Sequence, residues 1–157
     1  MNMIEKQRII ATYDKPDSEK ELSIIAKEIV SNFVCENDKL IGFTGDPKIG
    51  KSIMVEAMFP EVSLVNDDEN INIRPFPLIE DYKRDNFRQE TYHMDVMFEA
   101  AFNSKHKLGQ AAKSALKANK RIIIEHFDKI YHVIKINAHL NISMGEKIKV
   151  IRSKIES

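Results

Sequence analysis

Apolar residues in this chain recur at two spacings, one typical of strands and the other of helices. Short apolar runs, several rich in β-branched residues, predict strands, whereas apolar positions three and four residues apart predict helices. Strands are predicted at residues 6–13, 40–43, 62–65, 91–96, 121–125, 139–144 and 147–151. Helices are predicted at residues 18–35, 51–59, 97–118 (with a break near Asn103) and 127–134. Strands that alternate with helices indicate an α/β domain in which helices cover a central sheet.

Capping and turn residues refine this outline. Ser18 and Glu21 have the spacing of a capping box, in which two side chains satisfy open backbone donors at a helix start. Two prolines interrupt residues 73–83, so a strand there is expected only at a sheet edge or after Pro77. The last two predicted strands are joined around Gly145, which favours a mixed, partly antiparallel sheet.

One segment carries a chemical signature. Residues 45–52 read Gly-Asp-Pro-Lys-Ile-Gly-Lys-Ser and fit G-x-x-x-x-G-K-[ST], the pattern of a phosphate-binding loop between a strand and a helix. Its glycines allow a tight turn whose N–H groups point at phosphate oxygens. The Lys51 ammonium meets the β- and γ-phosphates, and the Ser52 hydroxyl can bind Mg²⁺. An ordinary turn with an incidental Lys-Ser is the weaker interpretation, and a nucleotide-binding loop is predicted.

Two acidic residues end predicted strands downstream of this loop. Glu125 closes the apolar strand 121–125, as the second acidic motif of phosphate-loop enzymes does, and Asp95 lies near the end of strand 91–96. Ligands of α/β sheets bind beyond the carboxyl ends of the strands, where both acids are expected. For either acid the alternative is a helix cap or an ion pair with a lysine. Of the five histidines only His93 is expected near this site, with a strand-surface position as the alternative.

Composition narrows the class of protein. The 157 residues carry 24 Lys and Arg and 24 Asp and Glu, so the zero net charge implies no general attraction to nucleic acid. Six cations between Ser104 and Arg121 are expected to form a solvated helix face, with a patch for tRNA or an acidic partner as the alternative. A single cysteine, Cys35, suits a reducing compartment. No apolar run reaches the ~20 residues that span a bilayer. One cytoplasmic domain over residues 1–157, without membrane contact, is therefore expected.

Together these residues resemble the TsaE (YjeE) family, small bacterial ATPases of tRNA threonylcarbamoyladenosine synthesis. SEKELSIIAKEIV is similar to that family's opening helix, and GDPKIGKS to its GDLGAGKT loop. YHMDV resembles its HxDLYR strand, IIIEHF its IEW strand, and HLNISMGEKIKV its closing pair of strands. RPFPLIEDY stands in the place of its SPTF-type segment, without the Ser and Thr. Three further departures are Lys48 for a loop glycine, Met97-Phe98 for Tyr-Arg, and His126 for Trp.

The resemblance implies a P-loop NTPase-like fold and a slow ATPase that uses ATP and Mg²⁺. It implies that the nucleotide is held by Gly45, Asp46, Pro47, Lys48, Ile49, Gly50, Lys51, Ser52 and Ile53. It assigns catalytic roles to Lys51, Asp95 and Glu125. The metal ligands that it implies are Ser52, Asp95 and Glu125. It also implies protein partners in a tRNA-modification-type complex, with indirect contact to tRNA.

Two other functions are compatible with the loop motif. A small-molecule kinase needs an acceptor site and a basic lid, for which the candidate loop cluster is Lys83, Arg84 and Arg88. A nucleotide-gated binding module with little turnover is favoured by the missing switch hydroxyls. Phosphate release without any acceptor separates the ATPase from the kinase, whereas tight ATP binding without turnover identifies the binding module.

Overall fold

The computed structural model describes residues 4–45, 50–62 and 76–156, which form helices around a six-stranded sheet. The strands are β1 (Ile4–Asp14), β2 (Leu40–Gly45), β3 (Thr91–Asp95), β4 (Arg121–Glu125), β5 (Leu140–Met144) and β6 (Lys147–Glu156). The helices are α1 (Glu19–Phe33), α2 (Lys51–Met58), α3 (Pro77–Lys83), α4 (Val96–Glu99), α5 (Lys105–Lys117), α6 (Tyr131–Ile134) and the 3-10 helix η3 (Phe127–Lys129). This arrangement confirms the expected α/β class with a mixed sheet flanked by helices.

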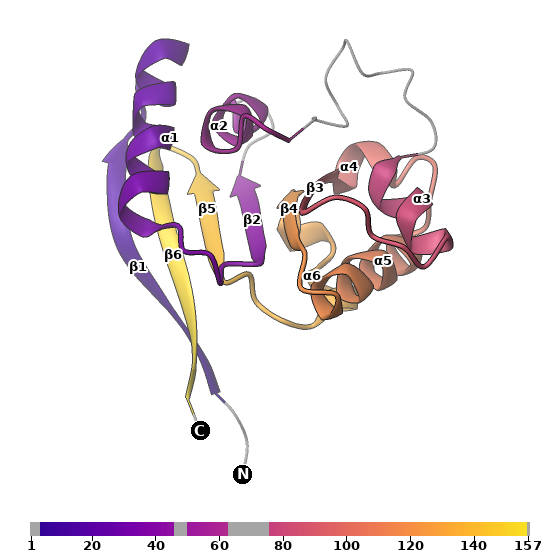
Figure 1. The fold of residues 1–157 in the computed structure, drawn as a ribbon. Helices are drawn as coiled ribbons and strands as arrows, with labels where there is room; N and C mark the ends of the chain where they lie inside the picture. Colours follow the sequence, from indigo (N-terminus) through magenta and orange to yellow (C-terminus); the bar gives the residue numbers. More distant parts are fainter. Residues whose placement is uncertain (1–3, 46–49, 63–75, 157) are drawn as a thin grey trace.

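The order of the strands sets the position of every candidate residue. The sheet runs β1-β6-β5-β2-β4-β3, as Figure 1 shows. Strands β5, β2, β4 and β3 are parallel, whereas β6 is antiparallel to both β5 and β1. Because parallel strands end at the same edge of a sheet, Gly45, Asp95 and Glu125 lie along one carboxyl edge. Asp95 and Glu125 are direct register partners.

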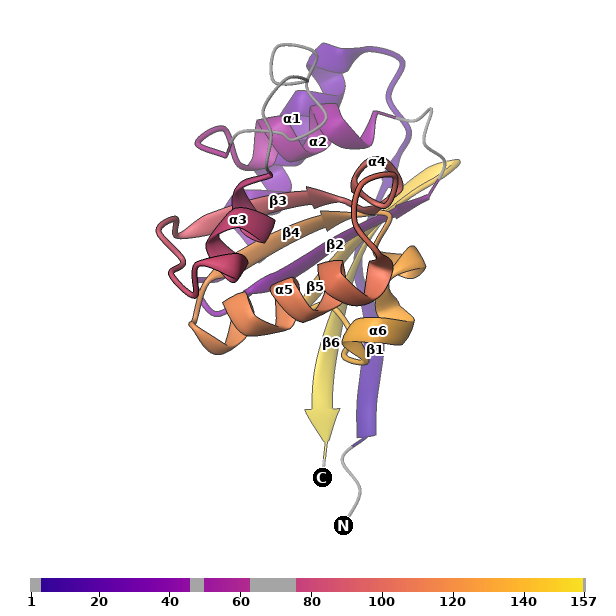
Figure 2. The same cartoon turned by 90° about the vertical axis from the view of Figure 1, so that its right-hand side faces the viewer.

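Helices cover both faces of the sheet (Figure 2). Side chains alternate along each strand, so Ile41 and Phe43 of β2 face α1 and α2, and Leu40 faces the opposite layer. The first layer forms one core, to which Ala26 and Ile29 of α1 contribute fully buried side chains. Helices α3, α5 and α6 build the second core. The carboxyl edge therefore lies between two well-packed layers that hold its residues in place.

Residues 77–83 form helix α3, so the strand allowed after Pro77 is absent from these residues. Phe76 is the N-cap, and Pro77 occupies the first helical turn. There a missing N–H costs no hydrogen bond, and the fixed backbone angle of proline suits a helix. Leu78 and Ile79 are each 1% exposed and anchor α3 in the second core.

The other element predictions have mixed outcomes. The break near Asn103 is confirmed, because α4 ends at Glu99 and α5 begins at Lys105. The helix predicted at residues 127–134 is divided into η3 and α6. Most of the strand predicted at residues 62–65 lies outside the described residues. Within the described part of the chain, no helix is long and apolar enough to cross a membrane.

Candidate functional site

The predicted phosphate loop starts at the end of β2 and leads into α2. Gly45 has a φ of 118° and Gly50 a φ of 80°, values that residues with a side chain rarely adopt. A Cβ added to Gly45 would lie 1.9 Å from the Met144 carbonyl oxygen. Residues 46–49 lie outside the described residues. Both glycines of the motif therefore occupy positions that favour glycine on backbone grounds alone.

The first turn of α2 places a buried cation beside this loop. Lys51 is 2% exposed, and its Nζ donates a hydrogen bond of 3.0 Å to the Gly45 carbonyl oxygen. The start of a helix also carries unpaired N–H groups and a partial positive charge. Positive charge is thus concentrated where the sequence predicts phosphate binding.

The Glu125 carboxylate is held between α2 and β3. Ser52 Oγ donates a hydrogen bond of 3.2 Å to Glu125 Oε1, and His93 Nε2 lies 2.6 Å from Glu125 Oε2. Glu125 is 2% exposed and His93 4% exposed. Because β4 lies between β2 and β3, the Glu125 side chain at its end reaches both His93 of β3 and Ser52 of α2, the helix that follows β2. Hydrogen bonds to an ionised group are stronger than neutral ones, so these contacts fix the position of the carboxylate.

Asp95 lies beside Glu125 but is also tied to the start of α4. Its Oδ1 accepts a hydrogen bond of 3.2 Å from the Phe98 N–H, which confirms that Asp95 caps a helix. The Asp95 N–H donates to Glu99 Oε2 at 3.1 Å. His126 Nε2 lies 3.9 Å from Asp95 Oδ1, and the backbone of His126 has a φ of 61°. Two carboxylates and two imidazoles therefore meet at neighbouring strand ends.

Glu99 is a member of this cluster that the sequence did not suggest. Glu99 is 0% exposed, and burial raises its pKa to about 8. The negative charge of Asp95 raises this pKa further, whereas the hydrogen bond from the Asp95 N–H lowers it. Glu99 Oε1 has no hydrogen-bond partner among the described residues. The available signal was its spacing, four residues after Asp95 at a helix start. At neutral pH Glu99 is therefore mostly protonated and uncharged.

The cluster contains oxygen ligands that suit Mg²⁺. Within the described ranges, no three His, Cys, Asp or Glu side chains are grouped to hold a metal ion. The Ser52 hydroxyl and Glu125 carboxylate are nevertheless adjacent, at 3.2 Å. Mg²⁺ commonly takes only one or two protein ligands and completes its shell with phosphate oxygens and water. The residues therefore fit a magnesium ion that arrives with a nucleotide.

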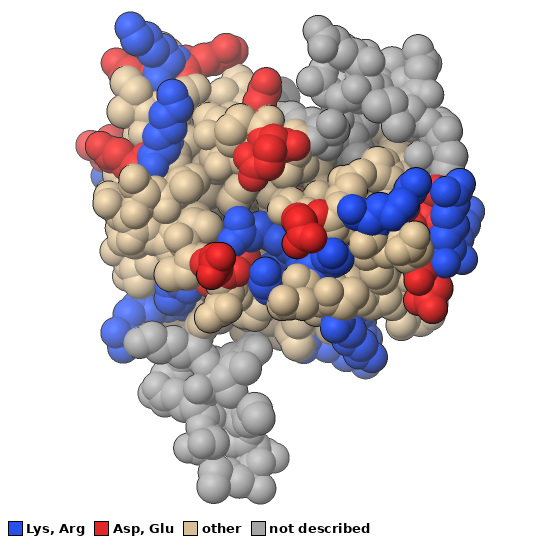
Figure 3. Space-filling view, viewed as in Figure 1, with Lys and Arg blue, Asp and Glu red and all other residues tan. Residues whose placement is uncertain are grey.

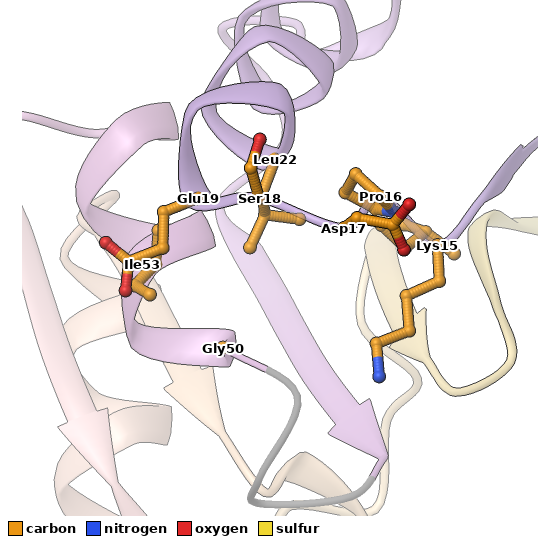
Figure 4. Close-up of a pocket in the computed structure, with 9 residues that line it drawn as sticks. Lys15, Pro16, Asp17, Ser18, Glu19, Leu22, Gly50 and Ile53 are labelled. Carbon is orange, nitrogen blue, oxygen red and sulfur yellow. The ribbon is translucent and has the colours of Figure 1, made fainter.

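A pocket of about 250 Å³ opens on the other flank of α2 (Figure 4). Residues 15–18, in the turn between β1 and α1, and Glu19 at the start of α1 form its rim. Leu22 of α1, Ile53 of α2 and Ile148 of β6 supply its apolar lining, and Gly50 belongs to it as well. The start of α2 thus has this pocket on one flank, at Gly50 and Ile53, and the cluster around Glu125 on the other, at Ser52.

The predicted site residues with described positions fall into two groups. Lys51, Ser52, Asp95 and Glu125 gather at the carboxyl ends of β2, β3 and β4. His93 lies beside Glu125, as expected, but the expectation that it is the only histidine there was wrong, because His126 Nε2 lies 3.9 Å from Asp95 Oδ1. Gly45 belongs with this first group, because its carbonyl oxygen accepts a hydrogen bond from Lys51 Nζ, whereas Gly50 and Ile53 line the pocket.

No protein-family model matches this sequence, and a search of curated proteins finds no significant match. A fold alone does not define an activity, because unrelated functions occur on the same architecture. The function must therefore be argued from the residues of the site and their chemistry.

Proposed function

We propose that this chain binds ATP with Mg²⁺ at the carboxyl edge of the sheet and hydrolyses it slowly, as an ATPase of the TsaE type. The contact between Ser52 and Glu125 is the observation that carries this proposal. In phosphate-loop enzymes the loop hydroxyl and an acid from another strand serve the same metal ion and nucleotide. Two residues 73 positions apart meet here in the arrangement that this chemistry needs. The P-loop NTPase-like fold is part of the same proposal.

Each side chain of the site has a different role in the proposed hydrolysis. The Lys51 ammonium compensates charge on the β- and γ-phosphates, and Ser52 with Glu125 would hold Mg²⁺, which adds positive charge at the phosphate oxygens. Glu125 and Asp95 orient the attacking water. The His93 imidazole fixes the Glu125 carboxylate from the side opposite Ser52. Such positioning and charge stabilisation account for most of the catalysis that phosphoryl transfer requires.

The kinase alternative gains no support from its candidate lid. Arg88 lies 2.6 Å from the buried Asp81 carboxylate, and Arg84 lies 2.7 Å from Glu80. Both arginines are therefore engaged by acids of α3. Direct hydrolysis remains the better proposal, because a lid must present its cations to the phosphates.

We also propose that the ATPase acts with protein partners in a tRNA-modification-type complex. This step rests on the resemblance to the TsaE family. On the face shown in Figure 3, Lys and Arg side chains are interspersed with Asp and Glu. Lys120, one of the cations beside α5, is paired with Glu90 at 3.3 Å. Mixed charge of this kind supports docking to a protein and indirect contact with tRNA rather than a tRNA-binding surface.

Phosphate release by the Glu125→Gln variant tests the proposed hydrolysis. The amide keeps the shape of the side chain but removes its charge, so ATP should still bind while turnover falls at least tenfold, about 1.4 kcal/mol of barrier. Asp95→Asn should show the same pattern, and the exposed Glu146→Gln provides the control. Unchanged turnover in both site variants, beside a wild type that hydrolyses ATP, moves the active centre elsewhere. ATP binding by the wild type without turnover, even with partners, identifies a binding module.

A further inference from the structure

A nucleoside triphosphate has a γ-phosphate at one end and a nucleoside at the other. The order of the strands separates the residues that would contact these two ends. Strand β2, which leads into the phosphate loop, lies between β4 and β5. Glu125 and Asp95 lie on the side of β4 and β3, where the proposed hydrolysis places the γ-phosphate. The pocket lies on the other side, lined by Gly50 and Ile53 of the loop–helix junction and by Ile148 of β6. A nucleotide whose γ-phosphate faces Glu125 therefore directs its nucleoside toward this pocket.

The lining of the pocket matches the chemistry of a nucleoside. Ile53 is half-buried and can contact a planar ring, whereas Leu22 and Ile148 line the pocket with side chains that are 7% and 0% exposed. Figure 4 shows Lys15 and Asp17 on one side of the pocket and Glu19 with Ile53 on the other. Pockets that enclose a whole drug-sized ligand measure about 300–1,000 Å³. At about 250 Å³, this pocket suits one part of a nucleotide, with the phosphates outside it.

We propose that this pocket is the nucleoside subsite of the nucleotide site. The inference rests on the proposed binding of ATP at the neighbouring loop. The base lies on the apolar surface, and the rim carboxylates of Asp17 and Glu19 receive its N–H groups. Ionised carboxylates only accept hydrogen bonds, so they can receive the N–H donors of the adenine amino group. The Lys15 ammonium adds positive charge at the same rim.

Photolabelling with 8-azido-ATP locates the base directly. Trypsin does not cleave between Lys15 and Pro16, so the peptide Ile9–Lys20 carries the whole rim and Glu21–Lys27 carries Leu22. We expect the label on one of these two peptides. Label confined to Gln89–Lys105, the peptide that holds β3 and α4, overturns the proposal.

Inorganic tripolyphosphate provides a second measurement, because it offers phosphates to the loop without a nucleoside. The ratio of its Kd to that of ATP reports the contribution of the pocket, and we expect a ratio of at least about ten. The double variant Asp17→Ala/Glu19→Ala should lower this ratio several-fold. Loss of two negative charges strengthens the binding of any polyanion, and this gain in affinity cancels in the ratio because it applies to both ligands. Both residues are exposed, and the exposed Glu28→Ala of α1, outside the pocket, is the matched control.

The outcomes distinguish failure of this inference from failure of the proposed function. If neither ATP nor tripolyphosphate binds to folded protein, the proposed nucleotide site is wrong and the subsite with it. Tripolyphosphate that binds as tightly as ATP overturns the subsite alone. A ratio that stays unchanged in the double variant overturns the role of the two carboxylates.

Discussion

Gly45 ends β2 in a conformation that a larger residue cannot share. With a φ of 118° and the Met144 carbonyl oxygen 1.9 Å from an added Cβ, the site excludes even alanine. We expect Gly45→Ala to lower the free energy of unfolding by about 2–5 kcal/mol, the sum of backbone strain and overpacking. Urea denaturation measures the change. Gly145→Ala is the control, because an added Cβ there has no described atom within 4 Å. Equal losses in the two variants would contradict the described loop geometry.

Glu99 should give the protein a measurable dependence of stability on pH. Burial raises its pKa from 4.5 to about 8, so between these values the folded chain holds a proton that the unfolded chain has lost. The contribution of this group to the free energy of unfolding is therefore complete in acid and declines as the pH rises toward 8. Because Glu99→Gln cannot titrate, the stability of the variant relative to wild type should rise across this range. The gain should be of the order of a few kcal/mol.

Urea denaturation at a series of pH values, in buffer with a chelator, checks the Glu99 prediction. The exposed Glu28→Gln variant is the control, and its curve of unfolding free energy against pH should run parallel to that of the wild type. Parallel curves for Glu99→Gln as well would show that the buried carboxyl does not titrate in this range.

At the scale of elements, one buried carboxylate joins α3 to β3. Asp81 is 0% exposed and accepts hydrogen bonds from the Tyr92 hydroxyl, the Arg88 guanidinium and the Arg88 N–H. Burial, together with the Asp81 contact, raises the pKa of Tyr92 to about 12. These bonds fix the chain between the end of α3 and the start of β3. The anchor thus adds to the pairing of β3 with β4, which holds His93 and Asp95 in place.

The Tyr92→Phe variant tests the anchor. Losing the hydroxyl leaves the buried carboxylate one donor short, so the free energy of unfolding should fall by about 1–3 kcal/mol. Chemical denaturation gives the value. The half-buried Tyr82→Phe of α3 is the matched control and should change stability by less than about 0.5 kcal/mol. A Tyr92→Phe variant as stable as its control would show that the anchor contributes little.

The sequence predicts some of these elements well and others poorly, for physical reasons. The strand, loop and helix predicted at residues 40–58 combine an apolar run with a motif whose positions each have a chemical purpose. The strand is present as β2 and the helix as α2. Pro75 and Pro77 limited any strand here to a sheet edge or to the residues after Pro77, but proline also suits the first turn of a helix, and sequence spacing does not choose between these two uses. Tertiary burial of Leu78 and Ile79 decides for the helix.

Long-range contacts of the site are the part that sequence patterns do not specify. Asp95 and Glu125 were both expected at strand ends, but their pairing depends on β4 lying between β2 and β3. The bond between His93 and Glu125 depends on the same order and on the register. The pocket at residues 15–19 brings together three segments far apart in the chain, and no local pattern announces it.

At the scale of the whole molecule, the sheet gathers charged groups of opposite sign at one edge. Net charge is zero, so the proposed attraction of a nucleotide would come from the local field and not from the protein as a whole. The buried Lys51 ammonium and the start of α2 provide positive charge, and the buried Glu125 carboxylate lies directly beside them. Under the proposed function, Mg-ATP would bring an anion to the positive charge and a cation to the carboxylate.

Calorimetric titration of Mg-ATP into the full chain tests this central claim most directly. We predict that wild type binds ATP and that Lys51→Ala loses most of the affinity, because the charge at the β- and γ-phosphates is gone. Lys48→Ala should lose much less, since the TsaE family has glycine at that position. No heat at millimolar ATP with folded protein, or equal loss in the Lys48→Ala and Lys51→Ala variants, would contradict the proposed site.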